Sequence, residues 1–216
     1  MITLFIFFLL LAVILNELFV NRNHIFHSYH GNAVPTIPVI QNCIISIIDC
    51  LQQSKFTFID VGSGNGTFLS EIVPYTNFSS YIGVEIDKTN HDEALSIHSP
   101  NVKFINKNIL CYEFQETPTM IYLYEPFFSM QFEEAVKLYQ NIFERLPKQH
   151  SVVIIYVTGV SFFGRSDLIC SKMFEKHNFK VVTTKKIGSI FIKRTIIVAT
   201  KKYKESKQLE NCLLHL

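Results

Sequence analysis

Nine residues carry the strongest fold signal in the chain: Phe58-Ile59-Asp60-Val61-Gly62-Ser63-Gly64-Asn65-Gly66. A short β-rich run ends in three glycines at alternate positions, and residues 67–73 then follow a helical pattern. Glycine permits positive φ and lets a ligand approach the bare backbone, while the start of the next helix offers unpaired N–H groups. The stretch therefore predicts a strand, a ligand-binding loop and a helix.

Glu85 closes the next β-rich run, residues 81–86, nineteen residues after Gly66. An ionised carboxylate has two acceptor oxygens and no donor, so it can accept hydrogen bonds from both hydroxyls of a ribose. Together with the glycine loop, this acidic strand end predicts a nucleoside site. The spacing argues against a nicotinamide dinucleotide, because the fingerprint GxGxxG requires glycine where Thr67 stands.

The rest of the sequence predicts a single α/β domain. Its 216 residues are 48% hydrophobic and 13% aromatic, which suits one compact core and excludes a disordered or coiled-coil protein. The hydrophobic pattern predicts strands at 56–61, 81–86, 102–106, 120–124, 152–157, 179–184 and 190–200, and helices at 39–51, 67–73, 92–97, 130–146 and 167–176. This alternation predicts a seven-stranded, mainly parallel sheet with helices on both faces. The last two strands, separated by a short turn at 185–189, predict a terminal antiparallel hairpin.

Polar residues follow four of these strands: Asp60, Glu85, Asn108 and Glu125. In an open parallel sheet, ligands bind beyond the carboxyl ends of the strands, where the strand order reverses. We therefore expect these strand ends to form the site.

The acidic residue before GxGxG and the acidic end of the second strand resemble motifs I and II of the class I S-adenosylmethionine-dependent methyltransferases, here of the small single-domain type. The resemblance covers about residues 30–200 and implies a Rossmann-like sheet and S-adenosylmethionine as cofactor. It implies that Asp60 lies near the amino group of the cofactor and that Glu85, followed by Ile86, holds the ribose. The remaining cofactor-binding residues that it implies are Gly62, Ser63, Gly64 and Gly66 on the methionine side, and Asn108 and Ile109 beside the adenine.

The segment after the fourth strand resembles the motif IV region, where amino-group methyltransferases often carry Asn or Asp, then Pro-Pro and an aromatic residue. Here the segment is Glu125-Pro126-Phe127. An Asn carbonyl suits a planar amide or exocyclic amine, whereas an anionic Glu suits an amine that must lose a proton, such as lysine. We therefore predict Glu125, Pro126 and Phe127 as catalytic residues and a protein lysine as the methyl acceptor.

Residues 1–22 form a separate hydrophobic segment. Residues 2–15 are almost wholly apolar, no basic residue precedes them and no small-x-small site follows, which argues against a cleaved signal peptide. As a helix, residues 2–20 would reach about 28 Å, close to the ~30 Å hydrocarbon core. We expect a retained membrane anchor, with a buried or partner-covered helix as the alternative, then the methyltransferase domain at 30–205 and a tail at 206–216.

A second, looser similarity is to membrane-anchored protein-lysine methyltransferases. These proteins join a hydrophobic N-terminal segment, a loop containing Val-Pro (here Val34-Pro35), a helix and the GxGxG strand. The similarity lies in this layout, and it implies a membrane-associated enzyme that acts on a protein.

Charged residues are distributed unevenly along the chain. The formal net charge is +2, but residues 172–216 carry 11 basic and 3 acidic side chains. Lysines on an edge strand prevent aggregation, and they also suit an anionic membrane surface or, as the second choice, the phosphates of nucleic acid.

The five cysteines contain no CxxC and no Cys/His spacing typical of a zinc site. We therefore expect no metal and a catalytic domain in a reducing, cytosol-like compartment. Cys43 and Cys50 lie seven residues apart in a helical pattern, which favours buried thiols that pack as small apolar groups.

Other functions stay open at this point. Glu125 departs from the family pattern, so the chain fits a non-catalytic nucleoside-binding or scaffold protein with the same fold. A nucleic-acid methyltransferase is a further alternative, and a nicotinamide-dependent oxidoreductase is the one that Thr67 argues against.

Overall fold

The computed structural model describes residues 38–50, 55–97, 101–124, 126, 132–147, 152–158, 173–188 and 193–201. Its helices are α2 (Pro38–Asp49), α3 (Thr67–Ile72), α4 (Lys88–Ser96) and α5 (Phe132–Arg145), with short 3-10 helices η2 (Val73–Tyr75) and η3 (Ile109–Cys111). The strands are β1 (Thr57–Val61), β2 (Ser80–Glu85), β3 (Val102–Asn106), β4 (Thr119–Tyr124), β5 (Val152–Thr158), β6 (Lys180–Gly188) and β7 (Lys193–Lys201). The predicted segments 1–22 and 206–216 lie outside the described residues, as do Glu125 and Phe127.

The strands form one sheet in the order β3-β2-β1-β4-β5-β7-β6. Strands β1 to β5 pair in parallel, whereas β7 runs antiparallel to both β5 and β6. The predicted α/β fold with a parallel sheet and a terminal antiparallel hairpin is therefore confirmed. The strand order reverses between β1 and β4, which marks the carboxyl ends of these strands as the place for a ligand.

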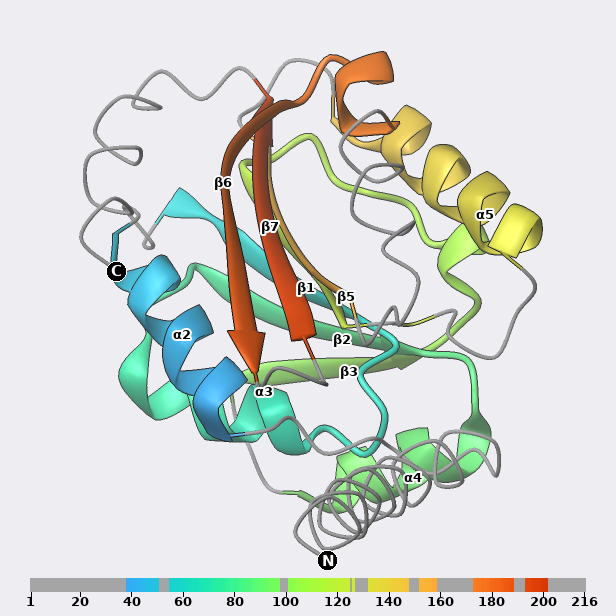
Figure 1. Cartoon of the computed structure of the whole chain (residues 1–216). Coiled ribbons are helices and arrows are strands. Elements are labelled where there is room, and N and C mark those ends of the chain that lie inside the picture. Colours follow the sequence, from blue (N-terminus) through green and yellow to red (C-terminus); the bar gives the residue numbers. More distant parts are fainter. Residues whose placement is uncertain are drawn as a thin grey trace, which may run out of the picture.

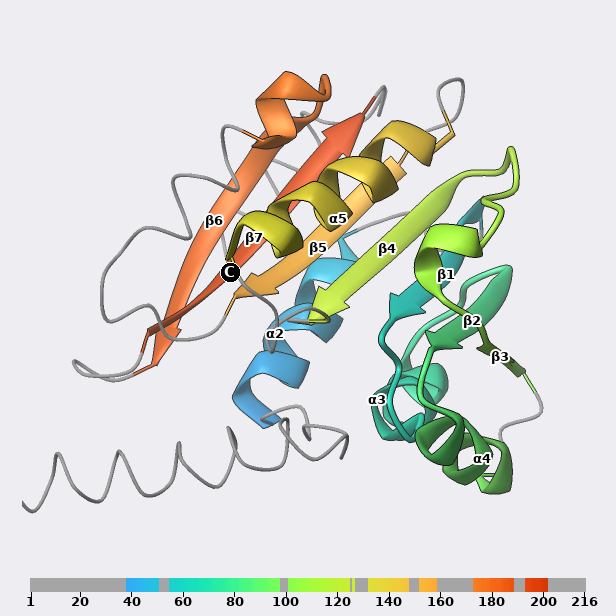
Figure 2. The ribbon, with the colours of Figure 1, turned by 90° about the vertical axis from the view of Figure 1, so that its right-hand side faces the viewer.

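Helices α2 and α3 lie on one face of the sheet and α5 on the other (Figures 1 and 2), and an apolar cluster fills each of the two interfaces. On one face α2 and α3 pack through side chains such as Ile44 and Leu69 against Phe58 and Tyr122. On the other face α5 packs through Phe143 against apolar residues of β1, β2, β4 and β7. Neighbouring residues of β1 point to opposite faces, as strand geometry requires, so both faces of this central strand are buried.

Two predicted boundaries are wrong, each for a local reason. Helix α4 begins at Lys88 rather than at residue 92, because the Asp87 side chain accepts a hydrogen bond from the Asn90 N–H and caps the helix there. Strand β6 continues to Gly188 through the predicted turn, because Lys185 and Lys186 pair with Ile196 and Thr195 of β7. Strand pairing overrides the turn signal of this lysine-rich segment.

The cysteines differ in part from the prediction, whereas the membrane anchor stays a prediction because residues 1–22 lie outside the described residues. Among the helices of the described residues, none is long and apolar enough to cross a bilayer. Cys43 is a buried free thiol, as predicted, but Cys50 is half-buried and disulfide-bonded, which differs from the expected thiol.

Candidate functional site

The site begins at the loop that leaves β1. Gly62, Gly64 and Gly66 all have positive φ, at +74°, +54° and +79°. Residues with a Cβ rarely adopt a positive φ, so the three alternate glycines allow the chain to turn here. The loop is fastened to β2, because the N–H groups of Gly62 and Ser63 donate to the Val84 carbonyl at 2.8 and 3.3 Å.

Glu85, the last residue of β2, holds this loop from the other side. One carboxylate oxygen accepts from the Gly64 N–H at 2.8 Å, and the other accepts from the Asp87 N–H at 2.8 Å. The side chain is buried, at 7% exposure. A carboxylate offers about four lone-pair sites, so each oxygen keeps capacity for one further donor such as a ribose hydroxyl.

Close packing explains a glycine that the sequence analysis did not select. A Cβ on Gly83 of β2 would lie 2.7 Å from the Ser63 hydroxyl oxygen and 2.7 Å from the Phe104 ring. Gly83 therefore makes room for the Ser63 side chain. The signal was present in the sequence, since Gly83 interrupts an apolar strand, and a glycine in a strand often marks a close approach.

Ser63 contributes a polar atom that lacks a partner. Its hydroxyl oxygen is buried and makes no hydrogen bond to any described residue. Buried polar groups in proteins are normally hydrogen-bonded, so an orphan of this kind in a glycine loop fits a site that is completed by a bound molecule.

The segment after β4 reaches the same loop. A Cβ on Gly62 would lie 3.1 Å from the Cβ of Pro126, so Pro126 packs directly against the bare backbone of Gly62. Of the predicted catalytic residues, Pro126 is thus brought to the glycine loop, whereas Glu125 and Phe127 lie outside the described residues.

Asp60 lies beneath the loop, near the end of β1, and is 3% exposed. In the sheet it sits between Gly83 and Tyr122 of the neighbouring strands. Burial, and secondarily the negative charge of Glu85, raise the pKa of Asp60 to about 8. At neutral pH this residue is therefore mostly the neutral acid, and Glu85 supplies the negative charge of the pair.

The two predicted adenine neighbours, Asn108 and Ile109, lie on the turn after β3, and Ile86 directly follows the last residue of β2. Asn108 lies two residues beyond the end of β3, and its side-chain oxygen accepts from the Leu110 N–H at 2.9 Å, which caps η3. The Ile109 side chain is buried in the cluster under α5. Ile86, at 66% exposure, is instead the apolar side chain left open next to Glu85.

Asn106 joins β3 to the end of β2 and was not selected from the sequence. Its amide nitrogen donates to the carbonyl oxygens of Glu85 and Ile86 at 3.0 and 3.1 Å. The residue therefore fixes the backbone on both sides of the Glu85 carboxylate. No local pattern reveals this contact, because it forms only when the two strands pair.

The chemistry of these residues suits a nucleoside more than a metal ion. In the part of the chain that the structure describes, no group of three or more His, Cys, Asp or Glu side chains is placed to hold a metal. The glycine backbone, the orphan Ser63 hydroxyl, the Glu85 carboxylate and the exposed Ile86 side chain instead offer polar and apolar contacts of the kinds that a nucleoside with a polar tail requires.

Comparison with known proteins finds similar structures but no similar sequences. No protein-family model and no curated protein matches the chain. Magnesium protoporphyrin IX methyltransferase (ChlM) from Synechocystis PCC 6803 with bound SAM is similar at a TM-score of 0.59 and 11% identity, over 76% of this chain and 78% of that chain. The N-methyltransferase NodS from Bradyrhizobium japonicum WM9 is similar at a TM-score of 0.54 and 10% identity, over 76% and 94%.

A protein with another activity is equally similar. The (4+2)-cyclase SpnF reaches a TM-score of 0.59 at 10% identity, over 75% of this chain and 79% of that chain. At such low identities the likeness concerns the fold, and the fold alone does not select the reaction. The chain has the fold of S-adenosylmethionine-dependent methyltransferases, as its two motifs predict.

The raised pKa of Asp60 gives a testable pH dependence of stability. The pKa of Asp60 is about 4 in the unfolded state and about 8 in the native state, so between these pH values only the native state holds the proton. The contribution of Asp60 to the free energy of unfolding is therefore full below pH 4 and is lost as the pH rises through 8. Between pH 5 and pH 8, the free energy of unfolding of wild type is expected to fall by roughly 2–4 kcal/mol relative to that of Asp60→Asn, at 1.36 kcal/mol per pKa unit. Urea unfolding of both proteins at both pH values measures this, and a constant difference would contradict it.

Proposed function

We propose that this protein is an S-adenosylmethionine-dependent methyltransferase that transfers a methyl group to an amine, with a protein lysine as the favoured acceptor. The observation that carries the proposal is the Glu85 carboxylate, which is hydrogen-bonded to the Gly64 N–H at the carboxyl edge of the sheet. An acidic strand end and a positive-φ glycine loop are thereby joined into one site on a methyltransferase fold.

The described residues fit the parts of this cofactor. When bound, S-adenosylmethionine supplies an electrophilic methyl group on a positively charged sulfur. The glycine loop admits the amino-acid part close to its backbone, where the Ser63 hydroxyl needs a partner. The free lone pairs of Glu85 would accept the ribose hydroxyls, and the exposed Ile86 side chain would cover the flat base.

The acceptor amine would approach from the segment after β4. Pro126 packs against Gly62, which supports a location of this segment beside the glycine loop. Methyl transfer is an in-line displacement: the N–C bond forms as the C–S bond breaks, and the bonding electrons pass to sulfur. Because an ammonium group has no lone pair, it must first release a proton, and Glu125 is the proposed proton acceptor.

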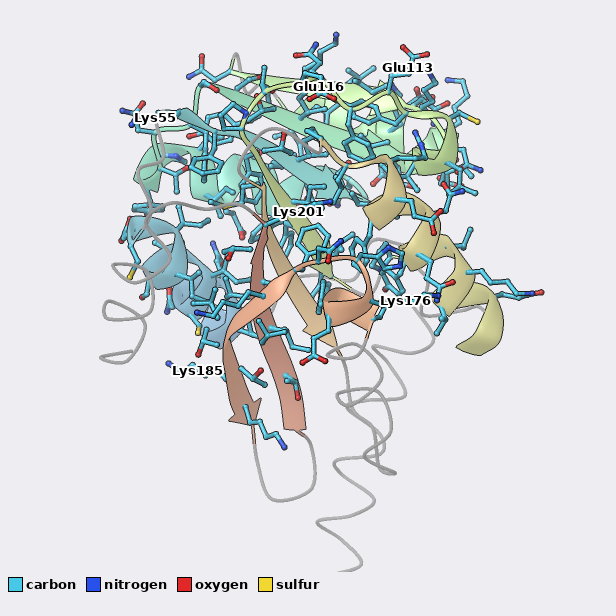
Figure 3. The ribbon with its side chains drawn as sticks, turned by 90° about the horizontal axis from the view of Figure 1, so that it is seen from above. Lys55, Glu113, Glu116, Lys176, Lys185 and Lys201 are labelled. Atoms are coloured by element: carbon cyan, nitrogen blue, oxygen red, sulfur yellow. The ribbon has the colours of Figure 1, made fainter. Side chains whose placement is uncertain are left out.

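The proposed partners follow from the sequence. We propose a protein substrate and membrane association through residues 1–22. Two described lysines of the C-terminal part face different ways, since Lys185 lies on the α2 side of the sheet and Lys176 beside α5 (Figure 3). A single flat surface for nucleic acid is therefore not favoured, and a nucleic-acid methyltransferase stays the second choice.

A non-catalytic nucleoside-binding protein is the main competing function. SpnF has a similar fold and is a cyclase, so the fold by itself does not select methyl transfer. Cofactor binding alone does not separate the two functions, whereas methyl transfer does.

Glu85→Ala is expected to weaken the binding of S-adenosylmethionine at least tenfold, because it removes two charge-assisted acceptors for the sugar and loosens the glycine loop. Isothermal titration calorimetry of wild type and variant measures the change. Glu71→Ala, an exposed carboxylate on α3, is the control and is expected to bind like wild type. Equal affinity of Glu85→Ala and wild type would contradict the nucleoside site.

Glu125→Gln is expected to lower methyl transfer by a factor of roughly 10² while cofactor affinity stays unchanged, because the amide cannot take up the proton of the amine. Purified protein incubated with methyl-labelled S-adenosylmethionine and cell lysate gives the rate, and mass spectrometry of the labelled proteins gives the methylated residue. Gly64→Arg, which fills the loop, is the negative control. Cofactor binding by wild type without any label transfer would instead favour the non-catalytic protein.

A further inference from the structure

Arg145, the last residue of α5, contacts both ends of the short helix η3. Its Nη1 donates to the Ile109 carbonyl at 3.1 Å, and its Nη2 donates to the Tyr112 carbonyl. The guanidinium carbon also lies 5.6 Å from the centre of the Phe114 ring. A side chain from one face of the sheet therefore fixes the backbone of the segment that follows β3.

This segment needs such support, because a 3-10 helix of three residues has little stability of its own. Three hydrogen bonds lie within it: the Leu110 N–H donates to the Asn108 side-chain oxygen, the Cys111 N–H to the Asn108 carbonyl and the Tyr112 N–H to the Ile109 carbonyl. The Ile109 and Tyr112 side chains are buried under α5. The Arg145 guanidinium adds two charge-assisted bonds at the points where the turn starts and ends.

Asn108 is the residue of this segment nearest in the chain to the carboxyl end of β3, which pairs with the end of β2 that carries Glu85. It is exposed and follows β3, whose last residue is tied by hydrogen bonds to the backbone of Glu85 and Ile86. Its side-chain oxygen is occupied by the Leu110 N–H, so its amide N–H₂ is the group left for other partners. The position of that group depends on the conformation of η3.

We propose that Arg145 is a positioning residue for the cofactor base: it holds η3 at both ends and thereby places Asn108 beside the adenine. This inference rests on the proposed cofactor function. Arginine suits the task because its planar fork reaches two carbonyls at once, whereas a lysine ammonium is a compact point charge.

The test compares a ligand that has the base with one that lacks it. S-adenosylhomocysteine carries the adenine, whereas S-ribosylhomocysteine keeps the sugar and the amino acid without it. Arg145→Met is expected to weaken S-adenosylhomocysteine about tenfold, and Arg145→Lys by a smaller factor because it can restore one of the two bonds. The affinity for S-ribosylhomocysteine is expected to stay unchanged, since that ligand has no group near Asn108.

Calorimetric titration of the full-length protein measures all of these affinities. Lys137→Met, which removes an exposed cation two turns earlier on α5, is the matched control and is expected to bind both ligands like wild type. A general loosening of the fold would weaken both ligands equally in Arg145→Met, and that result would overturn the inference.

Two further outcomes separate this inference from the proposed function. If wild type and Arg145→Met bind S-adenosylhomocysteine equally well, the proposed role of Arg145 is wrong and the cofactor function still stands. If wild type does not bind S-adenosylhomocysteine, the proposed cofactor function is wrong, and so is the role of Arg145 that rests on it.

Discussion

The structure depends above all on one buried carboxylate. Glu85 accepts an N–H from the glycine loop with one oxygen and an N–H from the turn after β2 with the other. These charge-assisted bonds offset the cost of burying the charge, and they hold the loop in the positive-φ conformation that its three glycines permit. Because the same carboxylate keeps free lone pairs, one interaction both shapes the loop and prepares it for a sugar.

The second acidic residue explains how such a site stays stable. Asp60 is buried beneath the loop near Glu85, and two ionised carboxylates in this place would repel each other. The raised pKa of Asp60 keeps it mostly neutral at pH 7, so the site carries the single negative charge of Glu85. A single charge suits a cofactor with a positively charged sulfur, and a proton on Asp60 is lost only in more alkaline solution.

The sequence predicted features that depend on short patterns. The glycine loop, the acidic end of β2 and the alternation of strands and helices all follow from residues close together in the chain, and the fold confirms the alternation. The start of α4 was missed although the Asp87 cap is also local, because the first apolar residue of the helix, Ala94, comes six residues after Lys88. Asn106 and Arg145 were not selected, since their partners are distant in sequence and meet them only after the strands pair and α5 packs. Gly83 was overlooked although its place inside an apolar strand is a local signal.

The central claim is that the loop after β1 and the carboxylate at the end of β2 bind one nucleoside together. A crystal structure with S-adenosylhomocysteine tests this most directly. We expect both ribose hydroxyls within hydrogen-bonding distance of the Glu85 oxygens, about 2.5–3.0 Å, and the amino-acid part along the glycine backbone. A nucleoside bound elsewhere, or a Glu85 carboxylate that makes no contact with the sugar, would contradict the account.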